Sequence, residues 1–336
     1  MIKYPVLNEN AVIGVTAPSS GLPDFMHHYL VDIKKRFQNT NEIVIGQSVM
    51  TQHKAKSTDS IMRAEELNDF FTADRIDLII PPFGGELALE ILNKIDYDRL
   101  RPKWVLGYSD ISTVLLAITF KTGIATAHGT NLVDLRGKYS DDTTAMWLEV
   151  LKTKVNEEVT QYSSQQFQSK WNHNQPTECV FNLDTPTEWK SVDQEAVKIE
   201  GRLLGGCIDV ISHLIGTPYG DVKTFREQYI KDEPVIWYLE NCEANPAEFR
   251  RMLLQMQYAG WFDNCSGILF GRTRVTESTE DYSIQDVYDD TAQDLNIPII
   301  YDIDCGHMPP QITFINGAYG IVECREGKGK IKQMFI

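Results

Sequence analysis

The sequence lacks the patterns that would place it in several large classes of proteins. Its six cysteines are widely spaced and include no Cys-x-x-Cys pair, so neither a zinc site nor a disulfide framework is predicted. No stretch approaches the roughly 18 consecutive apolar residues that a membrane-spanning helix needs, and residues 1–5 lack the apolar core of a signal peptide. We find no internal repeat. These absences predict a cytoplasmic globular protein that needs no metal.

Positive charge is also scarce. The chain has 32 Lys and Arg residues against 47 Asp and Glu residues, which gives a formal net charge of −15. Such an excess of acid repels nucleic acid polymers and anionic membranes, so we expect neither as a partner. With 336 residues, 42% of them apolar, the chain is long enough for two domains that each have a full core.

Strand and helix patterns alternate from the amino terminus to about residue 150. Apolar runs at 11–16 and 76–80 end in turn sequences rich in proline and glycine, and Ser57-Thr58-Asp59 predicts the start of a helix between them. This alternation is typical of a parallel sheet flanked by helices, whose reactive groups lie at the carboxyl ends of the strands. We therefore predict an α/β fold in which residues 1–152 form a doubly wound, parallel-sheet domain.

The rest of the chain is predicted as a linker and a second α/β domain. Residues 153–195 show no sustained period, which favours a linker or a long covering loop. Regular patterns resume over 196–336, with apolar strands at 197–199, 235–239, 266–270 and 299–301. Asn245-Pro246-Ala247-Glu248 has the residues of a helix start with a capping box. We expect the active-site cleft to lie between the two domains.

The most informative segment is Gly107-Tyr108-Ser109-Asp110, where an apolar run stops and a helical pattern begins. A serine on a sharp strand-to-helix turn exposes its hydroxyl, and the amides of the first helical turn can receive the oxyanion formed when it attacks a carbonyl. The second glycine of the usual motif is missing, because Ile111 stands there. Ser109 as a plain N-cap of a helix over 110–121 is the alternative interpretation.

Three strand-end residues have the types that nucleophilic catalysis needs. Ser109, Glu240 and His307 occur in the order nucleophile, orienting carboxylate and general base. Taken one at a time, Glu240 also fits a solvated charge at a strand end, and His307 fits an ordinary loop histidine beside glycine and proline.

Six short segments of the sequence belong together: Thr16-Ala17-Pro18-Ser19, Phe83-Gly84-Gly85, Gly107-Tyr108-Ser109-Asp110, Gly201-Arg202-Leu203-Leu204-Gly205-Gly206, Tyr238-Leu239-Glu240-Asn241 and Gly306-His307. Taken together they resemble the LD-carboxypeptidase family of serine peptidases. The order and separation of the segments match that family, and the similarity to it extends from about residue 10 to residue 325. Within the family the chain is most similar to the microcin C immunity branch, through residues 237–241, 259–262 and 271–272.

The resemblance implies a role for each of these groups. Ser109 is the implied nucleophile, His307 the base and Glu240 the residue that orients the imidazole, with an oxyanion hole made by the backbone amides of Gly85 and Asp110. Physical reasoning agrees, since glycine lets the chain approach a tetrahedral intermediate and the amide after the nucleophile lies at a helix N-terminus. The resemblance also implies hydrolysis through an acyl-enzyme without metal or organic cofactor, and a homodimer.

Two substrate classes remain open within that family. One is the bond between an aminoacyl or peptidyl group and a nucleotide in microcin C-like toxins, whose cleavage is a detoxification. The other is the murein tetrapeptide, from which D-Ala would be released. A hypothesis of another class is a catalytically silent protein that binds a small molecule in the cleft. Trp171 and Trp189, in the segment 153–195, are candidates to stack on a nucleobase, or else they anchor that segment to the body of the protein.

Four further residues are weaker candidates for a role in the site. His128 and His213 are predicted as packing histidines, with a catalytic role as the alternative for His128. Glu243 and Arg272 stand near predicted strand ends and are interpreted as solvated charges, with binding of polar substrate groups as the alternative.

Overall fold

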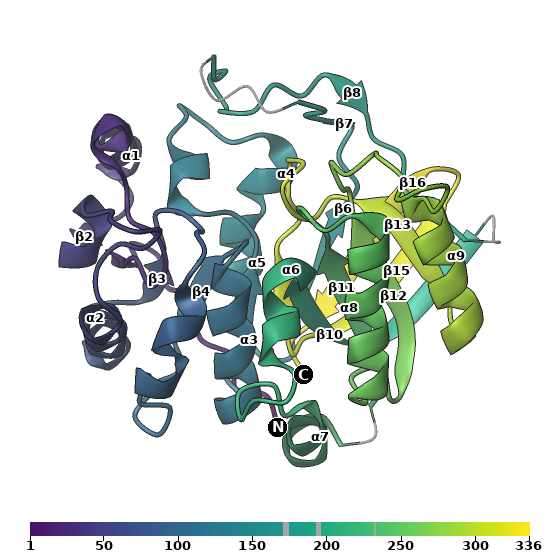
Figure 1. Ribbon diagram of the computed structural model, residues 1–336. Helices are drawn as coiled ribbons and strands as arrows, with labels where there is room; N and C mark the ends of the chain where they lie inside the picture. Colours follow the sequence, from purple (N-terminus) through teal and green to yellow (C-terminus); the bar gives the residue numbers. More distant parts are fainter. Residues whose placement is uncertain (171–174, 193–195, 232) are drawn as a thin grey trace.

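The computed structural model describes residues 1–170, 175–192, 196–231 and 233–336. It contains two large sheets that lie next to each other, with helices packed around them (Figure 1). The α/β fold class predicted from the sequence is confirmed. The two ends of the chain lie side by side, and the hydroxyl of Tyr4 donates a hydrogen bond of 3.1 Å to the carbonyl of Ile336.

The N-terminal sheet carries six strands in the order β14-β5-β4-β3-β1-β2. Its first five strands in the sequence are parallel to their neighbours, whereas β14 is antiparallel to β5. The strands are β1 (Ile13–Val15), β2 (Ile43–Ile45), β3 (Leu78–Ile80), β4 (Trp104–Gly107), β5 (Thr126–His128) and β14 (Phe314–Asn316). The helices of this half are α1 (His28–Phe37), α2 (Ser60–Thr72), α3 (Ile111–Thr122), α4 (Asp142–Ala145) and α5 (Trp147–Lys152).

The second sheet carries eight strands in the order β6-β16-β15-β10-β11-β12-β13-β9. Its centre is parallel and consists of β10 (Ala196–Cys207), β11 (Val235–Glu240), β12 (Cys265–Gly271) and β13 (Ile299–Ile303). The outer strands β6 (Glu158–Tyr162), β16 (Lys328–Met334), β15 (Tyr319–Arg325) and β9 (Lys190–Ser191) pair antiparallel. The helices are α6 (Ile208–Ile211), α7 (Val222–Phe225), α8 (Pro246–Tyr258) and α9 (Ile284–Leu295).

Local sequence signals explain where several helices begin. Asp59 caps α2 by accepting from two backbone amides, and Asn245 and Glu248 form the predicted capping box of α8. The residues after Leu87 form a 3-10 helix, η3 (Ala88–Lys94). The other short helices are η1 (Asp24–Met26), η2 (Gln47–Met50), η4 (Leu132–Leu135), η5 (Ser212–Leu214) and the π-helix η6 (Arg226–Ile230).

The segment 153–195 differs from the predicted linker or covering loop. Its first part forms β6 and its last part forms β9, and both strands extend the C-terminal sheet. Between them, β7 (Gln166–Phe167) and β8 (Thr185–Pro186) form a small separate sheet. Strands of two to five residues are too short to give a recognisable period, which is why the sequence pattern missed them. In addition, β14 belongs to the predicted C-terminal domain but pairs with the N-terminal sheet.

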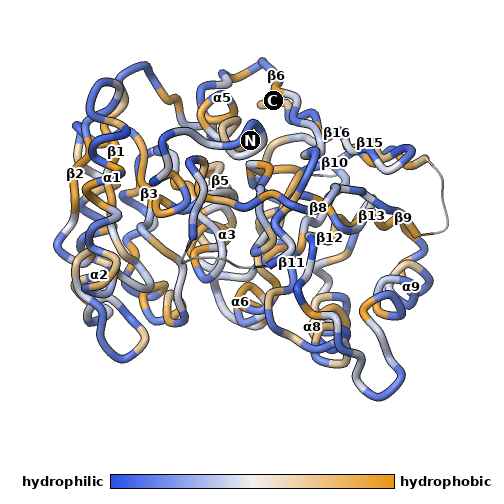
Figure 2. Tube along the Cα trace, turned by 90° about the horizontal axis from the view of Figure 1, so that it is seen from above, coloured by the Kyte–Doolittle hydropathy of each residue, from blue (hydrophilic) through white to orange (hydrophobic). Residues whose placement is uncertain are grey.

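Helix α3 connects the two halves. It packs against β10 and α6, and every one of its residues except Lys121 is buried. Apolar residues gather along the inner elements in Figure 2, and hydrophilic residues follow the outer loops. Because α3 begins at Ile111, two residues after Ser109, its packing in the core fixes the position of the nucleophile candidate. Among the described residues, no helix is both long and apolar enough to cross a bilayer.

Candidate active site

Ser109 lies on a tight turn between β4 and α3. Its φ of 64° falls in the left-handed region, which a residue other than glycine adopts only at a cost. Within the described residues no side chain caps the first turn of α3, so Ser109 is not the plain N-cap that the sequence left open. Its hydroxyl lies instead 3.0 Å from Nε2 of His307.

A glycine makes room for this turn. A Cβ atom on Gly84, in the loop after β3, would lie 2.8 Å from Cβ and 2.9 Å from Oγ of Ser109. Real Cβ atoms do not approach so closely, so any side chain at residue 84 would displace the hydroxyl. The loop after β3 therefore packs directly on the nucleophile candidate.

His307 follows β13 and makes two hydrogen bonds to Glu240, the last residue of β11. One carboxylate oxygen of Glu240, Oε2, accepts from Nδ1 of His307 at 2.8 Å and from its backbone amide at 2.9 Å. Gly306 has a φ of 96°, and a Cβ there would collide with the same carboxylate. With Nδ1 donating to Glu240, a neutral imidazole has its lone pair on Nε2, where it accepts from Ser109.

Burial and charge set the protonation of this pair. Glu240 is fully buried. Burial by itself lowers the pKa of His307, but the Glu240 carboxylate and the neighbouring Cys242 outweigh it and hold that pKa well above its usual value. Burial likewise raises the pKa of Glu240, yet its attraction to His307 and their hydrogen bonds leave the pKa below the usual range. The arrangement favours a carboxylate paired with an imidazolium, the state that follows proton transfer from a serine.

The Ser109 hydroxyl opens into a cleft with a volume of about 980 Å³, lined from both sheets. Gly85 and Asp110, whose amides were predicted as oxyanion donors, line the same cleft. Acidic side chains dominate its charged lining, with Arg274 at the rim forming a 3.1 Å ion pair with Glu243. The cleft is large enough for a small peptide or an aminoacyl nucleotide.

Of the two tryptophan candidates, Trp189 does not line this cleft. Trp189 is only 1% exposed, and its Nε1 donates to Oδ2 of Asp304 at 2.9 Å. It anchors β9 and its neighbours to the core, so it is not free to stack on a substrate. Trp171 lies outside the described residues.

The other four candidates are placed differently from one another. His128 is fully buried as predicted, but neither ring nitrogen has a hydrogen-bond partner among the described residues. His213 was predicted to pack, whereas it is exposed and lines the cleft. Glu243 is a surface charge at the cleft rim. Arg272 is not solvated, since it is 4% exposed and pairs with Asp304 at 2.6 Å.

The sequence analysis missed several groups that line the cleft. Cys207 ends β10 and is the register partner of Glu240, and Cys242 follows β11. The rule that carboxyl ends of parallel strands carry the site would have identified Cys207, because it directly follows Gly205-Gly206. No sequence pattern indicates a role for Arg274, which follows β12 and lines the cleft.

The fold and the site together define a class. Two adjoining α/β units, with a serine on a strained strand-to-helix turn that faces a histidine from the second unit, are those of a serine carboxypeptidase-type hydrolase. The chain belongs to the LD-carboxypeptidase family: the model of the N-terminal domain matches residues 13–129 and that of the C-terminal domain matches residues 200–321.

Individual relatives agree with the family. A Vibrio cholerae protein that carries a carboxypeptidase name is 26% identical to this chain, over 100% of the chain and 99% of its own length. MccF, a microcin C7 self-immunity protein, solved in complex with glutamyl sulfamoyl guanosine, has a TM-score of 0.82 at 19% identity over 100% of both chains. Muramoyltetrapeptide carboxypeptidase from Oxalobacter formigenes has a TM-score of 0.73 at 18% identity, over 96% of this chain and 99% of its own. The two structures share the fold of this protein.

Proposed function

We propose that this protein hydrolyses the bond between an aminoacyl or peptidyl group and a nucleotide, and thereby detoxifies microcin C-like compounds. The observation that carries the proposal is the continuous hydrogen-bonded series from Ser109 through His307 to Glu240 at the base of the cleft. MccF, the relative solved with an aminoacyl sulfamoyl nucleoside, supports the substrate class.

The chemistry follows from the roles of these three side chains. Ser109 Oγ attacks the acyl carbonyl while its proton passes to Nε2 of His307, and Glu240 stabilises the imidazolium that forms. The backbone amides of Gly85 and Asp110 donate to the oxyanion, a contribution of roughly 3 kcal/mol for one such donor. His307 then protonates the leaving group, and a water molecule activated by the same imidazole hydrolyses the acyl-enzyme.

The Asp110 side chain has a separate, positioning role in this proposal. Its Oδ2 accepts from the hydroxyl of Ser19 at 2.5 Å and from the backbone amide of Ala88 at 2.7 Å. Ser19 lies in the loop after β1, and a Cβ on Gly85 would collide with its hydroxyl. One buried carboxylate thus joins the nucleophile turn to both segments that hold Gly85 in place.

Replacing Asp110 by alanine is therefore expected to lower kcat by about 10- to 100-fold, because a misplaced oxyanion donor costs transition-state stabilisation. KM should change much less. Leaving the Ala88 amide buried and unpaired should also lower the free energy of unfolding by about 1–3 kcal/mol. Asp110→Asn keeps an acceptor at this position and should recover most of kcat, as steady-state kinetics and denaturant unfolding would show. An asparagine variant as slow as the alanine variant would contradict the positioning role.

An aromatic pocket next to the cleft favours a nucleotide as the leaving group. It has a volume of about 270 Å³ and shares Phe83 and Tyr108 with the cleft. Phe25 and Tyr29 line it from the N-terminal half, and Arg136 lies 4.4 Å from the centre of the Tyr29 ring. A flat base can stack on such rings, and the guanidinium can meet a phosphate or sulfamoyl group.

The substrate assignment predicts a selective effect of Phe25→Ala. Phe25 is 71% exposed, so its loss should not disturb the core. The variant should lose at least about fivefold in kcat/KM for an aminoacyl sulfamoyl adenosine, equivalent to about 1 kcal/mol of stacking, while any cleavage of a murein tetrapeptide changes less than about twofold. The measurement is kcat/KM for both substrates in the wild type and the variant. Tyr258→Ala is the matched control, because Tyr258 is an exposed aromatic residue at the end of α8.

The second candidate function is release of D-Ala from a murein tetrapeptide. It is favoured by the shared fold of the Oxalobacter formigenes muramoyltetrapeptide carboxypeptidase. Efficient cleavage of the tetrapeptide, with no cleavage of aminoacyl sulfamoyl adenosines, would replace the first proposal by this one. The cytoplasmic location and the homodimer stay predictions from the composition and the family resemblance.

A further inference from the structure

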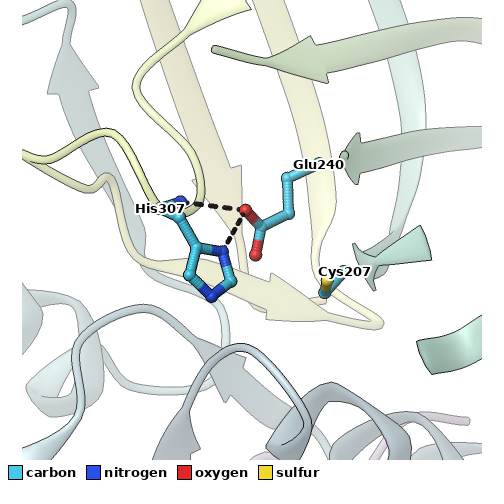
Figure 3. Close-up of side chains that lie close together, drawn as sticks. All are labelled: Cys207, Glu240 and His307. Carbon is cyan, nitrogen blue, oxygen red and sulfur yellow. Dashed lines mark hydrogen bonds and ion pairs between the residues drawn. The ribbon is translucent and has the colours of Figure 1, made fainter. Parts of the chain in front are cut away.

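A thiol that the proposed chemistry does not use lies beside the Glu240–His307 pair. Cys207 and Glu240 are the last residues of the neighbouring strands β10 and β11 and are paired in register, so their side chains emerge on the same face. Figure 3 shows Glu240 between His307 and Cys207. One ligand atom from each of the three side chains lies within 4.8 Å of the other two.

The carboxylate has an unused oxygen at this place. Oε2 of Glu240 accepts both hydrogen bonds from His307, whereas Oε1 is buried and has no hydrogen-bond partner among the described residues. An unpaired buried carboxylate oxygen is costly and attracts a cation. The Cys207 side chain is 2% exposed and also lines the cleft, so a small ion can reach it from there.

Among the described residues, His307 pairs with the Glu240 carboxylate, and it does so through Oε2, not through Oε1. His128 is the next histidine near Glu240, but burial lowers the pKa of His128 to about 4, so its imidazole is neutral at physiological pH. Neither of its ring nitrogens has a hydrogen-bond partner in the described ranges. Within the described residues, the negative charge of Glu240 is therefore opposed at close range by His307.

We propose that Cys207, Glu240 and His307 form an inhibitory binding site for Zn²⁺. A thiolate sulfur, an imidazole nitrogen and a carboxylate oxygen are the three ligand types that zinc prefers, with a fourth position left for water. Zinc bonds of about 2.0–2.3 Å place neighbouring ligand atoms about 3.5 Å apart. Side-chain rotations that move the ligand atoms by about 1 Å therefore suffice to close the site. Mg²⁺ requires oxygen ligands in octahedral geometry and is not expected to bind.

The binding step involves no oxidation. The Cys207 thiol releases its proton to solvent as the zinc–sulfur bond forms, and the imidazolium of His307 releases the proton on the nitrogen that binds zinc. That nitrogen and Oε1 of Glu240 then donate lone pairs to the metal. Whichever imidazole nitrogen is used, His307 can no longer both accept the Ser109 proton and donate to Glu240. Loss of hydrolysis on zinc binding rests on the proposed function, whereas binding itself does not.

Cobalt and zinc titrations test the site without substrate. Co²⁺ should give a thiolate-to-cobalt charge-transfer band with the wild type, and calorimetry should show one bound Zn²⁺ per chain. Cys207→Ala should abolish the band and weaken zinc binding at least about tenfold, the minimum expected on losing a ligand. Cys265→Ala is the matched control, because Cys265 is the first residue of β12 and lies at the amino end of its strand, whereas Cys207 and Glu240 end theirs. It should retain both signals.

Zn²⁺ should also stop hydrolysis in the wild type, EDTA should restore it, and Mg²⁺ should have no effect. Absence of the thiolate band, or unchanged zinc affinity in Cys207→Ala, would overturn the site. If the wild type binds zinc through Cys207 but cleaves none of the proposed substrates, the proposed function fails and the metal site stands.

Discussion

Ser109→Ala is expected to lower kcat by about 10⁴- to 10⁶-fold while the protein remains folded. The lost atom is the attacking oxygen, and in the part of the chain that the structure describes no other hydroxyl is hydrogen-bonded to Nε2 of His307. Stability should change by no more than about 1 kcal/mol, the usual net contribution of one hydrogen bond. Turnover of an aminoacyl sulfamoyl adenosine and denaturant unfolding, measured on the same preparation, separate the two effects.

A second serine provides the matched control. Ser283 caps α9 by accepting from the amide of Asp286, and it is not one of the residues that line the cleft. Ser283→Ala should lose about 1 kcal/mol of stability and keep full turnover, the reverse of the result at Ser109. Near wild-type activity in Ser109→Ala would show that Ser109 is not the nucleophile. A fluorophosphonate that labels the wild type but not this variant would exclude the binding-protein hypothesis.

Glu240→Gln is expected to lower kcat by about 10³- to 10⁴-fold and to change its pH dependence. The base must be neutral to accept the proton of Ser109, so the rate falls as pH drops through the pKa of His307. Glu240 raises that pKa, hence the acidic limb of the wild type should lie above the ordinary histidine value of about 6.5. Removing the carboxylate charge lowers the pKa, and the limb should move to lower pH.

The measurement is kcat/KM between about pH 5 and 9, a range that brackets the ordinary histidine pKa, in buffers that contain EDTA. Glu243→Gln is the matched control, since it removes the same charge from the cleft rim, where the side chain is exposed and pairs with Arg274. Its acidic limb should stay close to that of the wild type. If the acidic limbs of the wild type and Glu240→Gln lay at the same pH, the pairing of Glu240 with His307 would be refuted as the source of the raised pKa.

Short-range features of the sequence predicted much of this architecture. The apolar runs before Pro81 and Gly107 became β3 and β4, and the caps at Asp59 and Asn245 start α2 and α8. These signals work because periodicity and capping depend on residues within a few positions of one another. The strand-end rule selected Ser109, Glu240 and His307 for the same reason, and the family resemblance gave each a role.

Long-range packing accounts for what the sequence patterns missed. Trp189 has the same residue type as a stacking platform, but its burial depends on Asp304, 115 residues away. The short strands β6 and β9 exist only because β16 and β13 offer free edges to them. Arg272 is buried because the chain brings it to a carboxylate that no local pattern connects to it.

The amino-acid sequence alone thus determined the α/β class, the strand ends that carry chemistry and the identity of three candidate catalytic side chains. The tertiary structure decided that Ser109 faces His307 from the other half of the protein, that Glu240 presents one oxygen to His307 and leaves the other unpaired, and that Cys207 stands beside it. The reason is physical: turns, caps and strand periods are set by neighbouring residues, whereas contacts between strand ends arise only when two sheets pack around a buried helix such as α3.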